Sequence, residues 1–121
     1  MSIEALWAVQ FTGVNGVRRA TSGGVIVIET GRIFGGDSSM WYTGKYDRVE
    51  SAKGRFTVRI QTGVHFTEGF QSIFGGALGA QVLLGDIQVA PDQNSMAAML
   101  TVEGNPQMKL TATLTRVAEL P

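Results

Sequence analysis

The sequence predicts an all-β domain, an antiparallel up-and-down barrel of about eight strands with one short helix, and three observations carry that prediction. First, short segments alternate apolar and polar residues, most cleanly over residues 55–62, where an apolar side chain occupies every second position from Phe56. Second, turn-forming residues, including many of the 16 glycines, separate these segments. Third, most connections are short, which makes successive strands antiparallel neighbours, and pairing the first strand with the last removes both unpaired edges.

Eight segments carry a strand pattern, with turn signals between them. They span residues 6–11, 25–28, 32–34, 40–49, 55–62, 80–90, 96–103 and 109–116. Residues 30–31 form a two-residue hairpin connection that would place Glu29 opposite Arg32. Residues 12–16 are interpreted as a turn or short loop because they end in Asn-Gly. Gly44 lies inside a strand segment and predicts a kink of the kind that barrels need.

The connection from Gly63 to Gly79 is too long for a hairpin, and it predicts the short helix. Thr67 is a candidate N-cap residue, and Phe66, Phe70 and Phe74 would share one helical face at four-residue spacing. We expect this helix to lie on the barrel or over its mouth.

The composition predicts one soluble, cytoplasmic domain without cofactors. The chain has 121 residues, of which 44% are hydrophobic, enough for a single core but too few for two ordinary domains. Ten basic residues balance ten acidic ones, and a net charge of zero disfavours binding to nucleic acid. The sequence contains no cysteine, which excludes disulfides and thiolate chemistry and fits a reducing compartment.

No segment predicts a membrane span or a secretion signal. The sequence starts with Met1 to Glu4, which carries an acid where a signal peptide has a basic residue. The longest apolar stretch, residues 73–85, is rich in glycine and shorter than the roughly 20 residues that a membrane-spanning helix requires.

No residue pattern predicts catalytic machinery, and we expect a non-enzymatic protein. His65 is the only histidine and cannot build a multi-histidine metal site; a surface histidine is the simplest interpretation, and a general base beside an acid is the alternative. Residues 75–79 lack the Lys-Ser/Thr that follows a phosphate-binding loop. Asp37 and the two serines after it lack a nucleophile motif, and they predict a surface turn.

Two strand segments are apolar on both faces, and they predict a contact surface for a protein partner or a second copy of the chain. In residues 25–28 and 82–89, one face can point into the barrel, whereas the other must be covered or exposed. The residues expected on such a surface are Val25, Val27, Val82 and Leu84 from the strands and Phe66, Phe70 and Phe74 from the helix.

The aromatic residues bear on how the barrel interior is used. An eight-stranded barrel is just wide enough to be filled by side chains or to hold one small ligand. The residues that we expect to fill the interior are Trp7, Trp41, Tyr42, Tyr46 and Phe56. The alternative is a small-molecule carrier with a hollow barrel and the predicted helix as its lid.

Four short motifs in the first half of the chain form a further pattern. They are Leu6–Phe11 (LWAVQF), Gly23–Val27 (GGVIV), Gly31–Asp37 (GRIFGGD) and Tyr42–Gly44 (YTG). Together they resemble the GrlR family of small bacterial proteins, typified by a negative regulator of type III secretion genes. The resemblance implies a lipocalin-like barrel, a homodimer and a cytoplasmic regulator that sequesters a transcriptional activator by direct contact.

The resemblance is strongest at a Gly-Gly-Asp that follows a short strand and at the Tyr-x-Gly after it. The residues that match are Gly35, Gly36, Asp37, Tyr42 and Gly44, and we expect a structural role for them. The acidic run of the family regulator has no counterpart, since residues 47–53 mix both charge signs, and no partner-binding residues are carried over. The sequence thus predicts a non-enzymatic regulatory protein that acts by protein–protein contact, with a small-molecule-binding barrel as the alternative.

Overall fold

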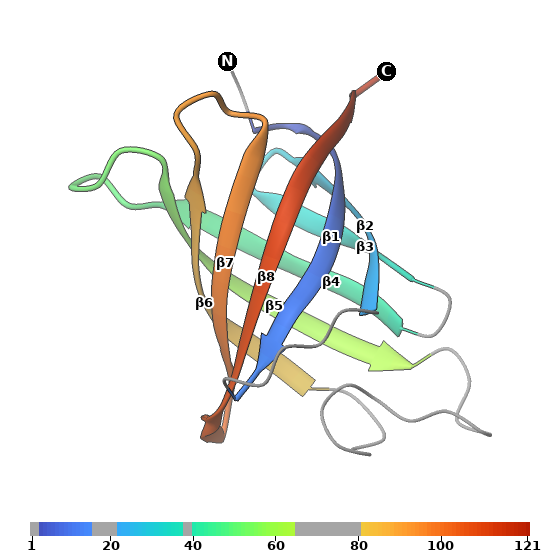
Figure 1. Cartoon of the computed structure of the whole chain (residues 1–121), viewed down its shortest axis with the longest axis vertical. Coiled ribbons are helices and arrows are strands. Elements are labelled where there is room, and N and C mark those ends of the chain that lie inside the picture. Colours follow the sequence, from blue (N-terminus) through green and yellow to red (C-terminus); the bar gives the residue numbers. More distant parts are fainter. Residues whose placement is uncertain (1–2, 16–21, 38–39, 65–80) are drawn as a thin grey trace.

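The computed structural model describes residues 3–15, 22–37, 40–64 and 81–121, and these form eight β-strands (Figure 1). The strands are β1 (Ala5–Val14), β2 (Ser22–Glu29), β3 (Arg32–Gly36), β4 (Met40–Arg48), β5 (Arg55–Val64), β6 (Gln81–Val89), β7 (Ser95–Val102) and β8 (Asn105–Glu119). Each strand pairs with the next, and β1 also pairs with β8, so the sheet closes on itself. The predicted all-β, antiparallel, up-and-down barrel of about eight strands is therefore confirmed.

The pairing of β1 with β8 closes the barrel. It runs from Ala5 opposite Glu119 to Val14 opposite Leu110, and the blue and red strands lie side by side in Figure 1. This long ladder removes the two edges that an open meander would leave available for pairing with another chain.

Alternation along each strand sends one set of side chains into the barrel and the other set outward. The buried apolar set is Ala5, Trp7, Val9, Phe11, Val14, Ile26, Ile28, Ile33, Met40, Tyr42, Val58, Leu83, Ile87, Met96, Ala98, Leu100, Val102, Leu110, Ala112 and Leu114. A void among these side chains has a volume of about 40 Å³. That is close to the share of liquid volume taken by one water molecule, roughly 30 Å³, so side chains fill the described interior.

Trp41 departs from the expected interior set. It points away from the barrel axis and lies over Gly63, where an added Cβ would come within 2.3 Å of the indole ring. Tyr42, the next residue, points inward and is buried. Alternation within β4 therefore assigns these neighbouring aromatic side chains to opposite faces.

The hairpin between β2 and β3 confirms the predicted two-residue turn. Thr30 and Gly31 have φ angles of 50° and 78°, the left-handed conformation that a tight hairpin turn requires at both positions. Glu29 pairs with Arg32, and their charged groups lie 3.7 Å apart. This turn fixes the register, and with it the face on which each residue of β3 lies.

The predicted turn over residues 12–16 is wrong in its extent. β1 continues to Val14, because β8 supplies ladder partners as far as Leu110. The strand ends at Asn15, whose amide N–H donates to the Lys109 carbonyl at 2.7 Å and whose side-chain oxygen accepts from the Lys109 N–H at 2.8 Å.

The predicted helix is not confirmed, because residues 65–80 lie outside the described residues, and with them His65, Phe66, Phe70 and Phe74. Gly63 and Val64, placed at the start of that connection by the sequence, belong to β5 instead. The described part of the chain contains no helix of the length and hydropathy that a membrane crossing needs.

Candidate interaction surface

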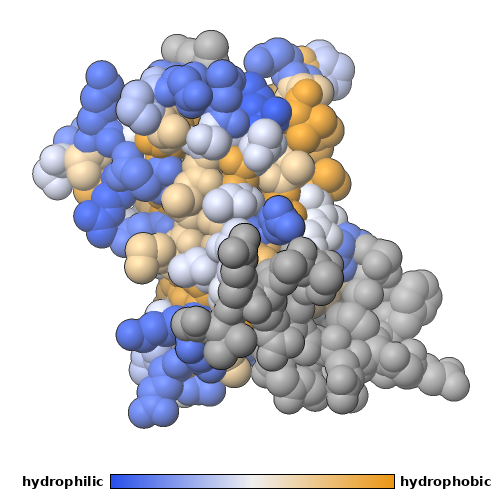
Figure 2. Space-filling model, in the orientation of Figure 1, coloured by the Kyte–Doolittle hydropathy of each residue, from blue (hydrophilic) through white to orange (hydrophobic). Residues whose placement is uncertain are grey.

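The outward side chains of β1, β2 and β3 form a continuous apolar surface. Leu6 is opposite Val27 in the ladder, and Val27 is opposite Phe34, so one apolar row crosses three strands. Ala8 is opposite Val25 in a second row. We call these five residues the β1–β3 outer face. Figure 2 shows hydrophobic surface along the upper right of the molecule, on the side where Figure 1 draws β1 and β2.

This face exists because β2 is apolar on both sides. Ile26 and Ile28 point inward and are 6% and 1% exposed, which satisfies the core requirement of the strand. Val25 then points outward and is 46% exposed. Phe34 on β3 also points outward and is 41% exposed. Large apolar side chains exposed side by side are typical of contact surfaces, whereas single ones are not informative.

A bulge in β8 extends the apolar surface beyond β1. Leu6 pairs with Ala118 and Trp7 pairs with Arg116, which leaves Val117 without a ladder partner. Val117 is 56% exposed. Bulges of this kind re-aim a side chain, and here the extra residue adds apolar surface next to Leu6.

Polar side chains border the β1–β3 outer face. Gln10 follows Ala8 on the outward side of β1, and on β4 Thr43 lies opposite Phe34 and Lys45 opposite Arg32, whereas Trp41 continues the second row beyond Gly36. The exposed ion pair at the β2–β3 hairpin closes one end. An apolar centre with a polar, solvent-accessible rim is the usual anatomy of a protein–protein interface.

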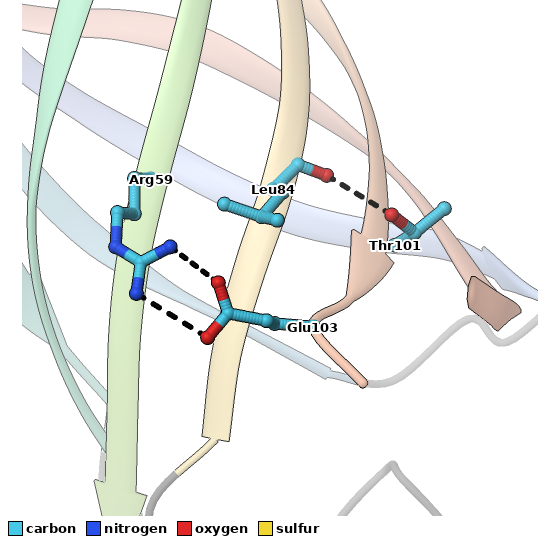
Figure 3. Close-up of polar contacts among 4 residues, drawn as sticks. All are labelled: Arg59, Leu84, Thr101 and Glu103. Atoms are coloured by element: carbon cyan, nitrogen blue, oxygen red, sulfur yellow. Dashed lines mark hydrogen bonds and ion pairs between the residues drawn. The ribbon is translucent and has the colours of Figure 1, made fainter. Parts of the chain in front are cut away.

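The other strand predicted to be apolar on both faces, β6, has a different surrounding. Leu84 points outward and is half-buried, but its ladder partners are Arg59 and Thr101 rather than apolar residues. Arg59 forms a bidentate ion pair with Glu103 across β6, as Figure 3 shows; the second contact, from Nη2 to Oε1, measures 3.3 Å. The hydrogen bond from Arg59 lowers the pKa of the Glu103 carboxyl, and the same bond raises the pKa of Arg59.

Further polar contacts complete this cover. The Glu103 amide N–H donates to the Val82 carbonyl at 2.8 Å, which holds the carboxylate beside β6. Arg55 forms a second ion pair with Asp86, on the same face, at 2.7 Å. Of the predicted surface residues, Val25 and Val27 therefore lie together on an apolar face, whereas Val82 and Leu84 lie on β6, four strands away, with ion pairs beside them.

The Gly-Gly-Asp and Tyr-x-Gly residues form a connected structural unit at the junction of β3 and β4. The Tyr42 hydroxyl donates to Oδ2 of Asp37 at 2.6 Å, and the Met40 amide N–H donates to Oδ1 at 2.7 Å. The Asp37 amide N–H in turn donates to the Met40 carbonyl at 2.9 Å. Burial first, and then the bond to Asp37, raise the pKa of the Tyr42 hydroxyl. The aspartate thus connects the two strands through both its main chain and its side chain.

The three motif glycines allow neighbouring strands to approach closely. An added Cβ on Gly35 would lie 2.1 Å from the Val25 carbonyl oxygen, and one on Gly44 would lie 2.3 Å from the Arg59 carbonyl oxygen. On Gly36 it would lie 2.5 Å from the carbonyl oxygen of Met40. Ordinary Cβ atoms do not approach a backbone oxygen so closely, so the backbone at these sites requires glycine.

Sequence reasoning missed Leu6, Ala8 and Phe34 as surface residues. A signal was present in the sequence. Trp7 and Val9 predict the inward face of β1, so Leu6, before Trp7, and Ala8, between Trp7 and Val9, must point outward. For Phe34 the signal was the two-residue hairpin, which fixes its register opposite Val27.

We also searched the described residues for a metal site and compared the whole chain with known proteins. No group of three or more His, Asp or Glu side chains placed to hold a metal ion occurs among the described residues. No protein-family model and no curated protein matches the chain.

Proposed function

We propose that this chain acts without catalysis by binding protein, and that the β1–β3 outer face is the contact surface. The observation that carries the proposal is the row Leu6–Val27–Phe34, in which apolar side chains meet across three strands; Leu6 and Val27 are half-buried and Phe34 is exposed. Strand spacing of about 4.8 Å makes this row roughly 10 Å wide, the scale of an interface centre rather than of a whole interface.

A second copy of the chain is the proposed partner at this face. In a two-fold dimer the same face contacts itself, so apolar centre meets apolar centre and polar rim meets polar rim. The net charge of zero leaves no overall repulsion between the two copies. The resemblance to the GrlR family supports the same arrangement, and it supports a regulatory role in which the dimer binds a transcriptional activator.

Oligomeric state tests the dimer. We expect sedimentation equilibrium to give a dimer at about 100 µM, a concentration at which a complex of micromolar affinity is nearly complete. Val27→Lys places a charge at the centre of the face and should weaken association about a hundredfold, the effect of losing a central contact. Met99→Lys is the matched control, because Met99 is 70% exposed but lies between Asp86 and Thr111, away from the face.

Two results would contradict the dimer at this face. One is a wild-type protein that stays monomeric at that concentration. The other is a dimer that Met99→Lys weakens as much as Val27→Lys does. Circular dichroism of both variants shows whether the barrel is intact, which separates a lost contact from a lost fold.

Capture from a bacterial lysate tests the regulatory part. We expect immobilised wild-type protein to retain a transcriptional activator. Phe34→Lys should not retain it, because this variant weakens the dimer that binds the activator, and Met99→Lys is again the control. If no transcription factor is enriched over a column of unrelated protein, the regulatory role is contradicted, whereas the dimer is judged by sedimentation.

A further inference from the structure

One end of the barrel opens into a cavity of about 1070 Å³. Its lining comes from the β4–β5 and β6–β7 connections, from the strand ends that flank them, from residues 113–115 of β8 and from Ile3. The buried side chains of Met96 and Leu114 form the floor, and the exposed side chains of Arg48 and Lys53 stand at the rim. Leu114 also lines the small void inside the barrel, so the packed interior closes the cavity from below. This volume is at the upper end of the range of about 300–1,000 Å³ for small-molecule sites.

Apolar side chains form the walls of this cavity. The rings of Tyr46 and Phe56 meet edge to face, with centroids 5.5 Å apart and an interplanar angle of 81°. Ile3 and Val89 are half-buried beside them and add aliphatic surface. Tyr46, Ile3 and Val89 also pack against the barrel core, which holds this part of the wall in place. A chain of methylene groups is the ligand portion that such walls favour.

Hydrogen bonds join the β4–β5 connection to the end of β6 at the opening. The Val89 amide N–H donates to the Gly54 carbonyl at 2.8 Å, and the Gln88 side-chain amide donates to the Lys53 carbonyl at 3.1 Å. Gly54 has a φ of 75°, which allows the chain to turn at this contact. Because the rim is already connected, a ligand would not have to order it on binding.

The described lining carries two cations and no acidic residue. Arg48 and Lys53 supply the positive charge, and neither forms an ion pair with a residue that the structure describes. The whole chain has a net charge of zero, so this positive charge is local to the rim. Asp47 and Glu50 are close to these cations in the sequence but do not line the cavity, so a carboxylate is the ligand group that Arg48 and Lys53 attract there.

Gln93 contributes an unpaired hydrogen-bond acceptor to the wall. It has a φ of 60° in a turn where its N–H donates to the Ala90 carbonyl at 2.9 Å, and Arg116 Nε donates to the Gln93 carbonyl at 3.1 Å. Its side-chain Oε1 is buried and accepts no hydrogen bond from the described residues. A buried acceptor without a donor is costly, and because this oxygen has almost no accessible surface, the Gln93 side chain would turn toward the cavity to accept a ligand N–H or O–H.

We infer that the open end of the barrel binds an anionic amphiphile whose carboxylate stands next to an N–H donor, the chemistry of an N-acyl amino acid. Arg48 and Lys53 receive the carboxylate, Gln93 accepts the N–H, and the acyl chain lies against Tyr46 and Phe56. No residue of the β1–β3 outer face lines this cavity, so the site is independent of the proposed protein contact.

Titration calorimetry with N-decanoylglycine below its micellar concentration tests the site. We expect the acid to bind at least about tenfold more tightly than its uncharged methyl ester, because the ester loses two charge contacts. Arg48→Gln combined with Lys53→Gln should remove this preference and leave binding of the ester unchanged. Lys45→Gln is the matched control, since Lys45 lies on the same strand as Arg48 but on the outside of the barrel, and it should bind like the wild type.

The N–H contact has its own comparison. Decanoate carries the same kind of chain and charge without the amide, and we expect it to bind wild-type protein about fivefold more weakly than N-decanoylglycine, the effect of one hydrogen bond. Gln93→Leu should bind the two probes equally. A wild-type protein that binds them equally would overturn the role of Gln93.

Equal affinity for acid and ester in the wild type, or no saturable binding of either, would overturn the site as a whole. Nuclear magnetic resonance locates the probe: we expect signals of Tyr46, Phe56 and Met96 to shift at saturation while those of Val25 and Val27 stay in place. Shifts confined to Val25 and Val27 would place the probe on the outer face and overturn the proposal, without affecting the sedimentation test of the dimer.

Discussion

The outer faces of β2 and β6, four strands apart around the barrel, start from similar sequences and end as different surfaces. Both strands carry apolar residues on both faces, yet the ladder neighbours of Val27 are Leu6 and Phe34, whereas Leu84 has Arg59 beside it and Asp86 on the same face. Val27 and Leu84 are both half-buried, but Val27 lies in an apolar row and Leu84 lies beside an ion pair. The outward chemistry of a strand is decided by the neighbours that the ladder gives it as much as by its own residues.

The cover over β6 uses charge in place of a partner protein. The aliphatic stem of Arg59 can lie along apolar surface while its guanidinium stays in water, paired with Glu103. Charged groups at such a position discourage association, because a partner would have to remove them from water. β2 has no such cover from the described residues, and for that reason the two faces are expected to behave differently in solution.

The largest expected effect comes from breaking the first face at its backbone. Gly35→Ala would place a Cβ 2.1 Å from the Val25 carbonyl oxygen, so β2 and β3 would have to separate. We expect a loss of about 3 kcal/mol in the free energy of unfolding, measured by urea denaturation. Gly31→Asn is the control, since no atom lies within 4 Å of that position and asparagine tolerates its φ of 78°. A Gly35→Ala protein as stable as the control would contradict the close approach.

The next largest effect is expected from placing an ion pair on the β1–β3 outer face, like the Arg59–Glu103 pair on β6. Val27, Phe34 and Thr43 are ladder neighbours on β2, β3 and β4, so Val27→Arg with Thr43→Glu would place an ion pair across β3. We expect the dimer to weaken about a hundredfold in sedimentation experiments, while the free energy of unfolding changes by less than about 1 kcal/mol. An unchanged dimer would show that the face is not the contact surface.

A smaller effect is expected where Tyr42 and Asp37 connect β3 to β4 beside the first face. Tyr42→Phe should lower the free energy of unfolding by about 1.5 kcal/mol at neutral pH, because the half-buried Asp37 carboxylate loses a donor at 2.6 Å. Burial and the bond to Asp37 raise the pKa of Tyr42 above its usual value of 10.0, so the folded chain keeps the hydroxyl neutral after the unfolded chain ionises.

The sign of the pH dependence follows from that difference. Wild-type stability is full below pH 10 and falls as the pH rises further, by at most about 1.4 kcal/mol per pH unit from this group. Tyr42→Phe removes this contribution, so urea denaturation above pH 10 should give the variant a shallower decline. Parallel declines in wild type and variant would contradict the assignment.

The smallest effect is expected from removing the cover of the second face. Arg59→Gln breaks an exposed ion pair, and pairs of that kind contribute little to stability. We expect an almost unchanged melting temperature together with stronger binding of a hydrophobic fluorescent dye, because Leu84 loses its charged neighbour. Lys109→Gln, which removes an exposed charge two strands from Leu84 in the same ladder row, controls for the loss of charge. No gain in dye binding over that control would mean that Arg59 does not cover Leu84.

The sequence predicted what local patterns determine. Alternation around Val58 and the turn at Thr30 were sufficient for the strands, the inward face and one register. The outward residues were predicted in part: Val25 and Val27 were expected to point outward, but the ion pair beside Leu84 joins residues 44 positions apart, which no local pattern reveals. The open cavity was missed for the same reason. Arg48 and the turn at residues 90–94 are far apart in the sequence and line one cavity only in the folded barrel.

The most direct test of the β1–β3 outer face as the contact surface is a concentration series of methyl spectra on protein labelled at leucine and valine. Between about 10 µM and about 1 mM, a range that spans micromolar dissociation constants, we predict shifts at Leu6, Val25 and Val27 and constant signals at Val82 and Leu84. Shifts at Val82 and Leu84 with none at the first three, or no shifts at all, would contradict the account.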